Sequence, residues 1–265
     1  MKRLLITGAA GGLGTALRSR LAPLAETIRL SDKTVLDDLS PSEEFVQCDL
    51  GDAAAVEALV QGCDGIVHFG GKSIEGPWSV INNANIQGVI NLYEAARKQG
   101  KPRIVYASSV HAVGFYPQDQ VIDNTAYPRP DGLYGISKVF GEAVAHAYHD
   151  KFGQETAIVR IGSCFEEPRN HRMLSTWMSF DDFAAMITRI FDVPKLGCPI
   201  LYGMSDNTAK FWDNSNVDWL GWKPQDDSER YRAKIDAAMP KPAPDAADVL
   251  WQGGLFCTDD IHEEE

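Results

Sequence analysis

The feature that most constrains the fold is a glycine-rich turn near the N-terminus, Thr7-Gly8-Ala9-Ala10-Gly11-Gly12-Leu13-Gly14. A short apolar run, Arg3–Thr7, precedes it, and leucines at every fourth position follow it on one face of an expected helix. Glycines at this spacing allow a tight turn and a close backbone approach to a ligand, and the helix N-terminus offers free N–H groups to phosphates. Because a strand precedes the turn and a helix follows it, the pattern predicts a dinucleotide site rather than a plain βα turn. The cofactor contacts expected here are Gly8, Gly11, Gly12, Leu13 and Gly14.

Short strand-like runs alternate with helical periodicity along the chain. In the first half, strands are also expected at 27–30, 45–48, 65–69 and 103–107, and Asp52 is expected to cap one of the intervening helices. The second half is less regular, with a helix over 134–152, a strand over Thr156–Ile161, a helix from a Ser179 cap through 191, a strand over 199–202 and a helix over 226–238. This alternation predicts an α/β fold built from right-handed βαβ units, a Rossmann-type doubly wound parallel sheet with a small C-terminal substrate-binding region.

We expect a single domain over residues 1–265. Residues from about 1 to 160 would form the dinucleotide-binding core, about 161–239 would supply mostly substrate-side elements, and 240–265 would be an irregular arm that is rich in proline and acid. Partial disorder of that arm is the alternative to an irregular structure, and Glu263-Glu264-Glu265 is expected to be a frayed terminus.

Residues at the ends of the expected strands complete the nucleotide site. Asp32 closes the second strand, where a carboxylate accepts hydrogen bonds from the ribose hydroxyls and repels a 2′-phosphate. This position favours NAD over NADP, although a solvated turn aspartate is the alternative. Asp49 and Leu50 follow the third strand and Gly70 and Gly71 follow the fourth, so all four are expected to contact the cofactor at the same sheet edge.

A phenol and an ammonium group lie four residues apart in Tyr134-Gly135-Ile136-Ser137-Lys138, on one face of the expected helix. A tyrosine with an ordinary pKa near about 10 is a poor base at neutral pH. An adjacent Lys138 ammonium and a positively charged nicotinamide favour the phenolate, so Tyr134 becomes a candidate general base. Ser109 ends the preceding strand, where its hydroxyl can orient a reacting substrate oxygen.

Charge and cysteine content exclude several classes of partner. The chain has 25 Lys and Arg against 37 Asp and Glu, a net charge of −12, which argues against nucleic acid or an anionic membrane surface as partner. An anionic ligand then needs a local cationic group, and Arg169-Asn170-His171-Arg172 is such an island, although a solvated loop is the alternative. Five scattered cysteines without a CxxC pattern predict neither a metal site nor a disulfide framework. With no apolar stretch of membrane-spanning length, a cytoplasmic location is expected.

Together these motifs resemble the extended branch of the short-chain dehydrogenase/reductase superfamily. The resemblance covers about residues 1–235 and also includes Asp64-Gly65-Ile66-Val67-His68, Ser108-Ser109, the helix with Asn85, Gly88 and Asn91, and Arg160-Ile161-Gly162-Ser163. Within that branch, several segments are similar to the uronate dehydrogenase family: Gly70-Gly71-Lys72-Ser73, Arg160-Ile161-Gly162-Ser163-Cys164, Arg172-Met173-Leu174-Ser175-Thr176-Trp177 and Gly221-Trp222-Lys223-Pro224.

The resemblance implies NAD as cofactor and a free sugar acid as substrate, whose hemiacetal hydroxyl is oxidised to a lactone. It implies Tyr134 as the base, Lys138 as its pKa-lowering and ribose-binding partner, and Ser109 as the group that orients the hydroxyl. It also implies that Ser73, His111 and Ser163 line the sugar and that Arg172 pairs with the carboxylate. Val110 stands where this resemblance leads us to expect a polar residue such as Asn. A homo-oligomer through the helices around 85–100 and 134–152 is a further expectation.

Two other functions are open at this stage. One is a nucleotide-sugar epimerase or reductase of the same superfamily, but the lean region after Ser163 leaves little chain for a lobe that holds a nucleotide. The other is a catalytically silent NAD-binding regulator, a class that commonly loses the tyrosine and lysine that this chain keeps as Tyr134 and Lys138.

Overall fold

The computed structural model describes residues 1–262, so the predicted frayed terminus Glu263-Glu264-Glu265 lies outside the described residues. Its centre is a seven-stranded sheet in the order β3-β2-β1-β4-β5-β6-β9, in which every neighbouring pair is parallel. The strands are β1 Arg3–Thr7, β2 Thr27–Asp32, β3 Glu43–Gln47, β4 Gly65–His68, β5 Arg103–Ser109, β6 Thr156–Ile161 and β9 Ile200–Gly203. The strand order reverses between β1 and β4, as in the predicted doubly wound fold, and such a reversal places a ligand crevice at the carboxyl ends of the strands.

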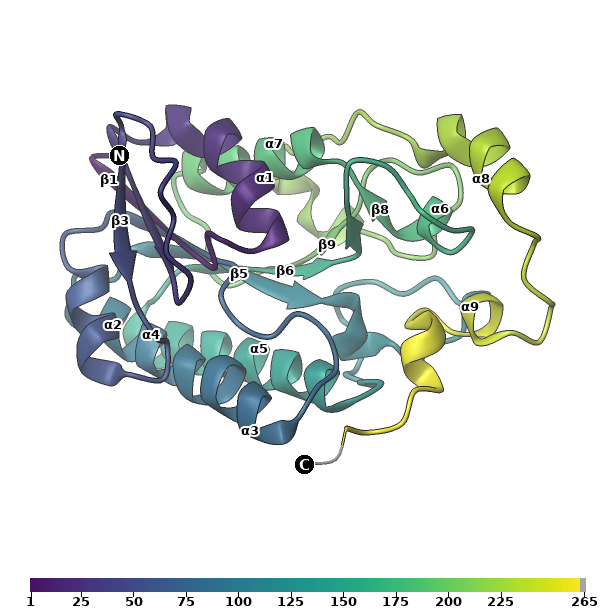
Figure 1. The fold of residues 1–265 in the computed structure, drawn as a ribbon, viewed down its shortest axis with the longest axis horizontal. Coiled ribbons are helices and arrows are strands. Elements are labelled where there is room, and N and C mark those ends of the chain that lie inside the picture. Colours follow the sequence, from purple (N-terminus) through teal and green to yellow (C-terminus); the bar gives the residue numbers. More distant parts are fainter. Residues whose placement is uncertain (263–265) are drawn as a thin grey trace.

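Helices cover both faces of the sheet (Figure 1). One layer contains α2 Ala53–Val60, α3 Trp78–Ile81, α4 Gly88–Lys98 and α5 Leu133–Phe152, and the other contains α1 Gly12–Leu21 and α7 Phe180–Asp192. Alternate residues of β1 explain the two layers, because Leu4 and Ile6 pack toward α1 and α7 whereas Leu5 packs toward α2 and α4. The predicted caps are confirmed: Asp52 accepts hydrogen bonds from the first turn of α2, and Ser179 accepts one from Asp182 in α7. No helix within residues 1–262 is long and apolar enough to cross a bilayer.

Short elements at the end of the sheet form the second part of the molecule. They are β7 Ser163–Cys164, α6 Met173–Thr176, β8 Trp177–Met178 and α8 Arg232–Ala238. A third apolar cluster contains Val110, Tyr202 and Trp212. Val110 therefore packs into this cluster, with 2% of its surface exposed, rather than facing a ligand as the expected polar residue would.

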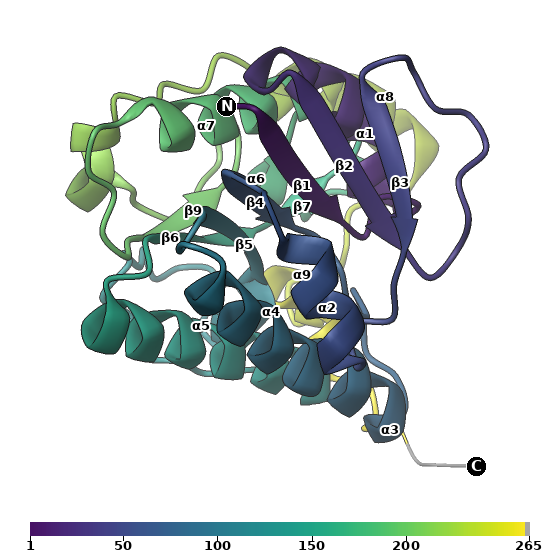
Figure 2. The ribbon, with the colours of Figure 1, turned by 90° about the vertical axis from the view of Figure 1, so that its left-hand side faces the viewer.

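One prediction for the C-terminal quarter was wrong in detail. The single helix expected over 226–238 is split into a 3-10 turn, Ser228–Tyr231, and the shorter α8. The Ser228 hydroxyl donates to the carbonyl of Leu174 and its N–H donates to Asn207, and these buried bonds hold the first turn away from regular helix. In the described part of the arm, residues 240–262, two short elements, α9 Ala247–Leu250 and a 3-10 turn, Gly254–Cys257, are joined by irregular segments. In Figure 1 the arm descends along the right-hand end of the molecule, from α8 to the layer of α5. Figure 2 shows that it lies beyond the carboxyl edge of the sheet.

Candidate active site

A cavity of about 1070 Å³ lies along the carboxyl edge of the sheet and gathers the candidate residues. All the predicted cofactor, catalytic and substrate residues line it except Gly14. A Cβ atom at Gly14 would collide with the backbone of Gly8 and Ala9, so this glycine allows the helix to pack on the turn. The structure thus brings all the predicted site residues except Gly14 to one cavity.

The glycine turn has the geometry of an anion cradle. Gly8 has a φ of +69°, and a Cβ atom there would lie 2.7 Å from the backbone nitrogen of Gly70. Helix α1 begins with no side-chain cap and no acidic residue in its first turn, so its N–H groups are free of internal competitors. At Gly12 nothing lies within 4 Å of the Cβ position. A pyrophosphate therefore fits this end of the cavity sterically and electrostatically.

Two carboxylates, those of Asp32 and Asp49, line the end of the cavity where the adenosine was expected to bind. The two oxygens of Asp32 accept hydrogen bonds from the N–H groups of Ala10 and Thr34, at 3.0 and 3.1 Å. Beside it, the Lys33 ammonium lies 2.9 Å from the Asp49 carboxylate. A hydrogen bond from the Gly51 N–H, followed by the contact with Lys33, holds the pKa of Asp49 below its usual value. The Lys33 ammonium is thus paired with Asp49 and not with Asp32.

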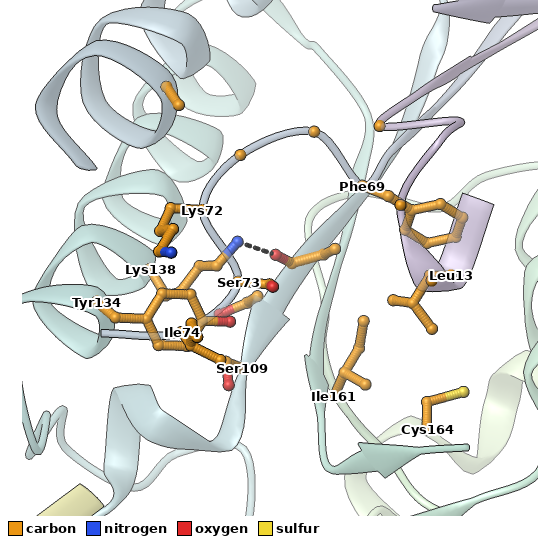
Figure 3. Close-up of a pocket in the computed structure, with 18 of the residues that line it drawn as sticks. Leu13, Phe69, Lys72, Ser73, Ile74, Ser109, Tyr134, Lys138, Ile161 and Cys164 are labelled. Carbon is orange, nitrogen blue, oxygen red and sulfur yellow. Dashed lines mark hydrogen bonds between the residues drawn. The ribbon is translucent and has the colours of Figure 1, made fainter. Parts of the chain in front are cut away.

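Tyr134, Ser109 and Lys138 lie on one side of the cavity (Figure 3). The Lys138 ammonium donates to the carbonyl of Ala107 at 2.8 Å and lies 5.4 Å from the centre of the Tyr134 ring. Burial lowers the pKa of Lys138 to about 8, against the opposing effect of Glu142. Burial raises the pKa of Tyr134 to about 12, although a hydrogen bond with Ser109 acts in the other direction. The phenol is therefore protonated until further positive charge enters the site.

The N-terminus of the catalytic helix α5 is capped from outside the helix. Its own N-cap residue, Gly132, has no side chain, and the Glu75 carboxylate accepts hydrogen bonds from the N–H groups of Leu133 and Tyr134, at 3.2 and 2.9 Å. Glu75 lies in the same loop as Ser73, between β4 and α3. This cap therefore ties the substrate-side loop to the backbone of the candidate base.

Polar groups at the other end of the cavity come from separate segments. The Ser163 hydroxyl is paired with the Thr176 hydroxyl at 2.7 Å. The Arg172 guanidinium donates to the backbone carbonyl of Gln252, with its Nε at 3.0 Å. No ion pair joins Arg172 to a carboxylate within residues 1–262, so its charge is left for a ligand. Burial lowers the pKa of Arg172, while Asp248 opposes this, and a guanidinium remains charged in this range.

Sequence reasoning missed four residues of this site. Glu75 caps α5, Asp131 binds the His111 ring, and the arm supplies the Gln252 carbonyl and the Phe256 ring, which stacks on His111 with centroids 3.9 Å apart. No local pattern marked any of them: even Glu75, a carboxylate that could serve an uncapped helix N-terminus, lies 58 positions before Leu133.

The fold and site define a Rossmann-type dinucleotide-binding protein. The chain matches the NAD dependent epimerase/dehydratase family over residues 4–188 and belongs to that family. It is 56% identical over 264 residues to the uronate dehydrogenase of Agrobacterium fabrum, with 100% of both chains covered.

Two solved structures have the same fold throughout. A mutant uronate dehydrogenase from Agrobacterium tumefaciens, complexed with NAD, matches with a TM-score of 0.98 and 56% identity, covering 100% of each chain. A glucuronic acid dehydrogenase from Chromohalobacter salexigens matches with a TM-score of 0.97 and 52% identity, covering 98% of each chain. The family predicted from the sequence motifs is thereby confirmed.

Proposed function

We propose that this chain is an NAD-dependent uronate dehydrogenase, which oxidises the anomeric hydroxyl of free glucuronate or galacturonate to the aldarolactone. The similarity to uronate dehydrogenases extends over the full chain. The observation that carries the substrate class is Arg172, a guanidinium without a carboxylate partner among residues 1–262, in the same cavity as Tyr134 and Ser109. A neutral carbonyl orients this guanidinium without neutralising it, so it can bind a carboxylate through two parallel hydrogen bonds.

The cavity fits NAD. Gly8, Gly11 and Gly12, with the uncapped start of α1, would hold the pyrophosphate, and Asp32 would hold the adenosine ribose. Lys138 would bind the second ribose. NAD, when bound, supplies the acceptor for the electron pair of the oxidised C–H bond and adds a positive charge to the site. The open space beside Gly12 and the pairing of Lys33 with Asp49, which leaves Asp32 without a cationic partner among residues 1–262, support this assignment.

In this proposal, side chains of the protein orient the substrate hydroxyl and accept its proton. Ser109, which is hydrogen-bonded to Tyr134, orients the anomeric hydroxyl, and Tyr134 takes its proton. The free phenol has a pKa of about 12 because it is buried, so deprotonation requires the nearby Lys138 ammonium together with the charge of the cofactor. Ser73, His111 and Ser163 would then hold the sugar ring while Arg172 holds the carboxylate.

The test compares uronates with their neutral aldoses by following NADH absorbance in the wild type and two variants. Tyr134→Phe should abolish turnover while NAD still binds, because the base is lost and the ring is kept. Arg172→Ala should raise KM for uronates roughly a hundredfold and change the slow reaction of neutral aldoses little, because a buried charge partner of the substrate is removed.

Arg97→Ala serves as the control, since Arg97 pairs with Glu94 on the exposed surface of α4. It should leave both KM values unchanged. Oxidation of neutral aldoses as fast as of uronates by the wild type would refute the assignment of the substrate. Turnover of nucleotide sugars alone would move the chain to the epimerase or reductase class.

We also infer that the protein is a cytoplasmic homo-oligomer. Its five cysteines are free thiols, as expected in a reducing compartment. Apolar side chains on the layer of α3 and α5 are exposed, with 40% of Trp78, 46% of Ile136 and 40% of Phe152 accessible. Light scattering coupled to size exclusion should give a mass above 29.1 kDa, and Phe152→Glu should lower it if this face is the interface.

A further inference from the structure

A fully buried carboxylate lies behind the ring of His111. The Asp131 side chain has 0% of its surface exposed, and its Oδ2 lies 2.6 Å from His111 Nδ1. Its other oxygen, Oδ1, has no hydrogen-bond partner within residues 1–262. Burial of a carboxyl group with one oxygen left without a partner is costly, so a local role is needed to account for it.

Three glycines from three segments leave the room for this carboxylate. Gly114 follows the turn after β5, Gly135 lies in the first turn of α5, and Gly253 belongs to the C-terminal arm. A Cβ atom at Gly114 or Gly253 would collide with Asp131 Oδ2, and one at Gly135 would lie 3.1 Å from Oδ1. Distant parts of the chain therefore converge on one position and keep it free for a carboxylate.

The His111 ring lies among the reacting groups. It stacks on Phe256 and meets the edge of the Tyr134 ring at 5.8 Å between centroids, and its backbone N–H donates to the Ser109 hydroxyl. The ring lines the cavity, and its Nε2 makes no hydrogen bond to a described residue. With Nδ1 bound to Asp131, Nε2 is the ring nitrogen left for a ligand.

We propose that Asp131 is a positioning residue, which fixes the orientation and the tautomer of His111 so that Nε2 accepts a hydrogen bond from a sugar hydroxyl. An ionised carboxylate can only accept, so the proton of the neutral ring must reside on Nδ1, and Nε2 presents a lone pair. The substrate rests on the proposed function, but the tautomer does not. The ring is held from one edge by Asp131 and from one face by Phe256, and it cannot turn without breaking both contacts.

Asp131→Asn should move the His111 proton from Nδ1 to Nε2 while keeping the shape of the side chain at position 131. An amide that turned its oxygen to His111 would leave its NH2 group buried at the unpartnered Oδ1 position, and an orphaned donor is less tolerable than an orphaned acceptor. The NH2 group should therefore face Nδ1, and the proton should move to Nε2. The sugar hydroxyl then loses its acceptor, so kcat/KM for uronate should fall roughly tenfold, mainly through KM, with NAD affinity unchanged.

The ring nitrogens can be observed directly in the full-length protein labelled with ¹⁵N-histidine. The His111 signals are assigned by their loss in His111→Ala. The wild type should show a protonated Nδ1 and an unprotonated Nε2, and Asp131→Asn should show the opposite. Asp150→Asn is the matched control, because Asp150 makes the same contact with His149 Nδ1, at 3.0 Å, on the surface. It should change neither the His111 signals nor turnover.

A double-mutant cycle separates positioning from general structural support. In a His111→Ala background, Asp131→Asn should lower kcat/KM no further, because its effect passes through the ring. An equal loss in both backgrounds would overturn the proposal. So would a wild-type ring that carries protons on both nitrogens, or only on Nε2, at the pH of turnover, and this measurement needs no folded variant. Failure of the proposed function would be seen differently, as a wild type that oxidises no uronate.

Discussion

Replacement of Glu75 by glutamine should weaken the cap that this loop residue provides to the N-terminus of helix α5. The wild-type carboxylate accepts from two consecutive N–H groups at the start of α5, those of Leu133 and Tyr134. Glutamine has the same shape but a single acceptor oxygen. One of the two N–H groups would then face an NH2 group, with no other side-chain cap available from Gly132.

The expected cost follows from these two bonds. Loss of one charge-assisted hydrogen bond in a half-buried position costs about 1.5 kcal/mol. Loss of the negative charge at the helix N-terminus costs about 0.5 kcal/mol more. The free energy of unfolding should therefore fall by about 2 kcal/mol, which corresponds to a decrease of roughly 5 °C in Tm for a domain of this size. Because the cap holds the backbone of Tyr134 and of the residue before it, kcat should fall roughly tenfold through misplacement of the base.

Urea unfolding and initial rates of NADH formation measure both effects. The matched control is Glu57→Gln, which removes an exposed carboxylate that lies 2.9 Å from Lys98. An exposed pair of this kind contributes less than about 1 kcal/mol, and kcat should not change. If Glu75→Gln were as stable and as active as the control, the cap would have no role in holding the base, and this reasoning would be wrong.

Three further changes test other parts of the structure. Burial lowers the pKa of Lys138 from 10.5 to about 8, so between those values this side chain holds fewer protons in the folded protein than in the unfolded chain, and its own contribution to the free energy of unfolding rises with pH. The free energy of unfolding of the wild type minus that of Lys138→Met, from urea titrations at fixed pH, should therefore increase across that window, because the buried thiols, whose pKa values are raised, contribute equally to both proteins. Asp32→Ser should lower the NAD-over-NADP ratio of kcat/KM at least roughly tenfold, and adding Asp49→Asn should lower it further by releasing Lys33. Deletion of residues 247–265 should retain NAD binding in fluorescence titrations and lose uronate turnover, because Arg172 and His111 lose their contacts with the arm.

The nucleotide half of the site could be predicted because each of its parts is local. The strand, the glycine turn and helix α1 form one βα unit, so the spacing of Gly8 and Gly11 already contains the geometry of the cradle. Asp32 and Asp49 follow from the rule that parallel strands end at one edge. The same logic predicted Tyr134 and Lys138 from their helical spacing. The sequence did not show that Gly14 packs on the turn instead of lining the cavity, because a glycine required for packing and one required for ligand contact look the same in a sequence.

The supports of the substrate half could not be predicted, because they join segments that are far apart. Glu75 reaches Tyr134 across 59 positions, and Arg172 reaches Gln252 across 80. The amino-acid types are also uninformative: the group that holds Arg172 is a backbone carbonyl, which every residue possesses. Contacts of this kind depend on the path of the arm, and its Pro-rich, acidic composition resembles that of a disordered tail.

The choice of these supports follows from the charge of the chain. A protein of net charge −12 offers no long-range attraction to an anion. Interactions between solvent-exposed charges are also largely screened beyond about 10 Å. Its recognition must come from one cation within contact distance, and a carboxylate that oriented this cation would also neutralise it. Arg172 is held instead by the Gln252 carbonyl, whereas the carboxylate of Asp131 contacts the His111 ring. The arm thus orients the charged group with a dipole and leaves the full charge of the guanidinium for the substrate.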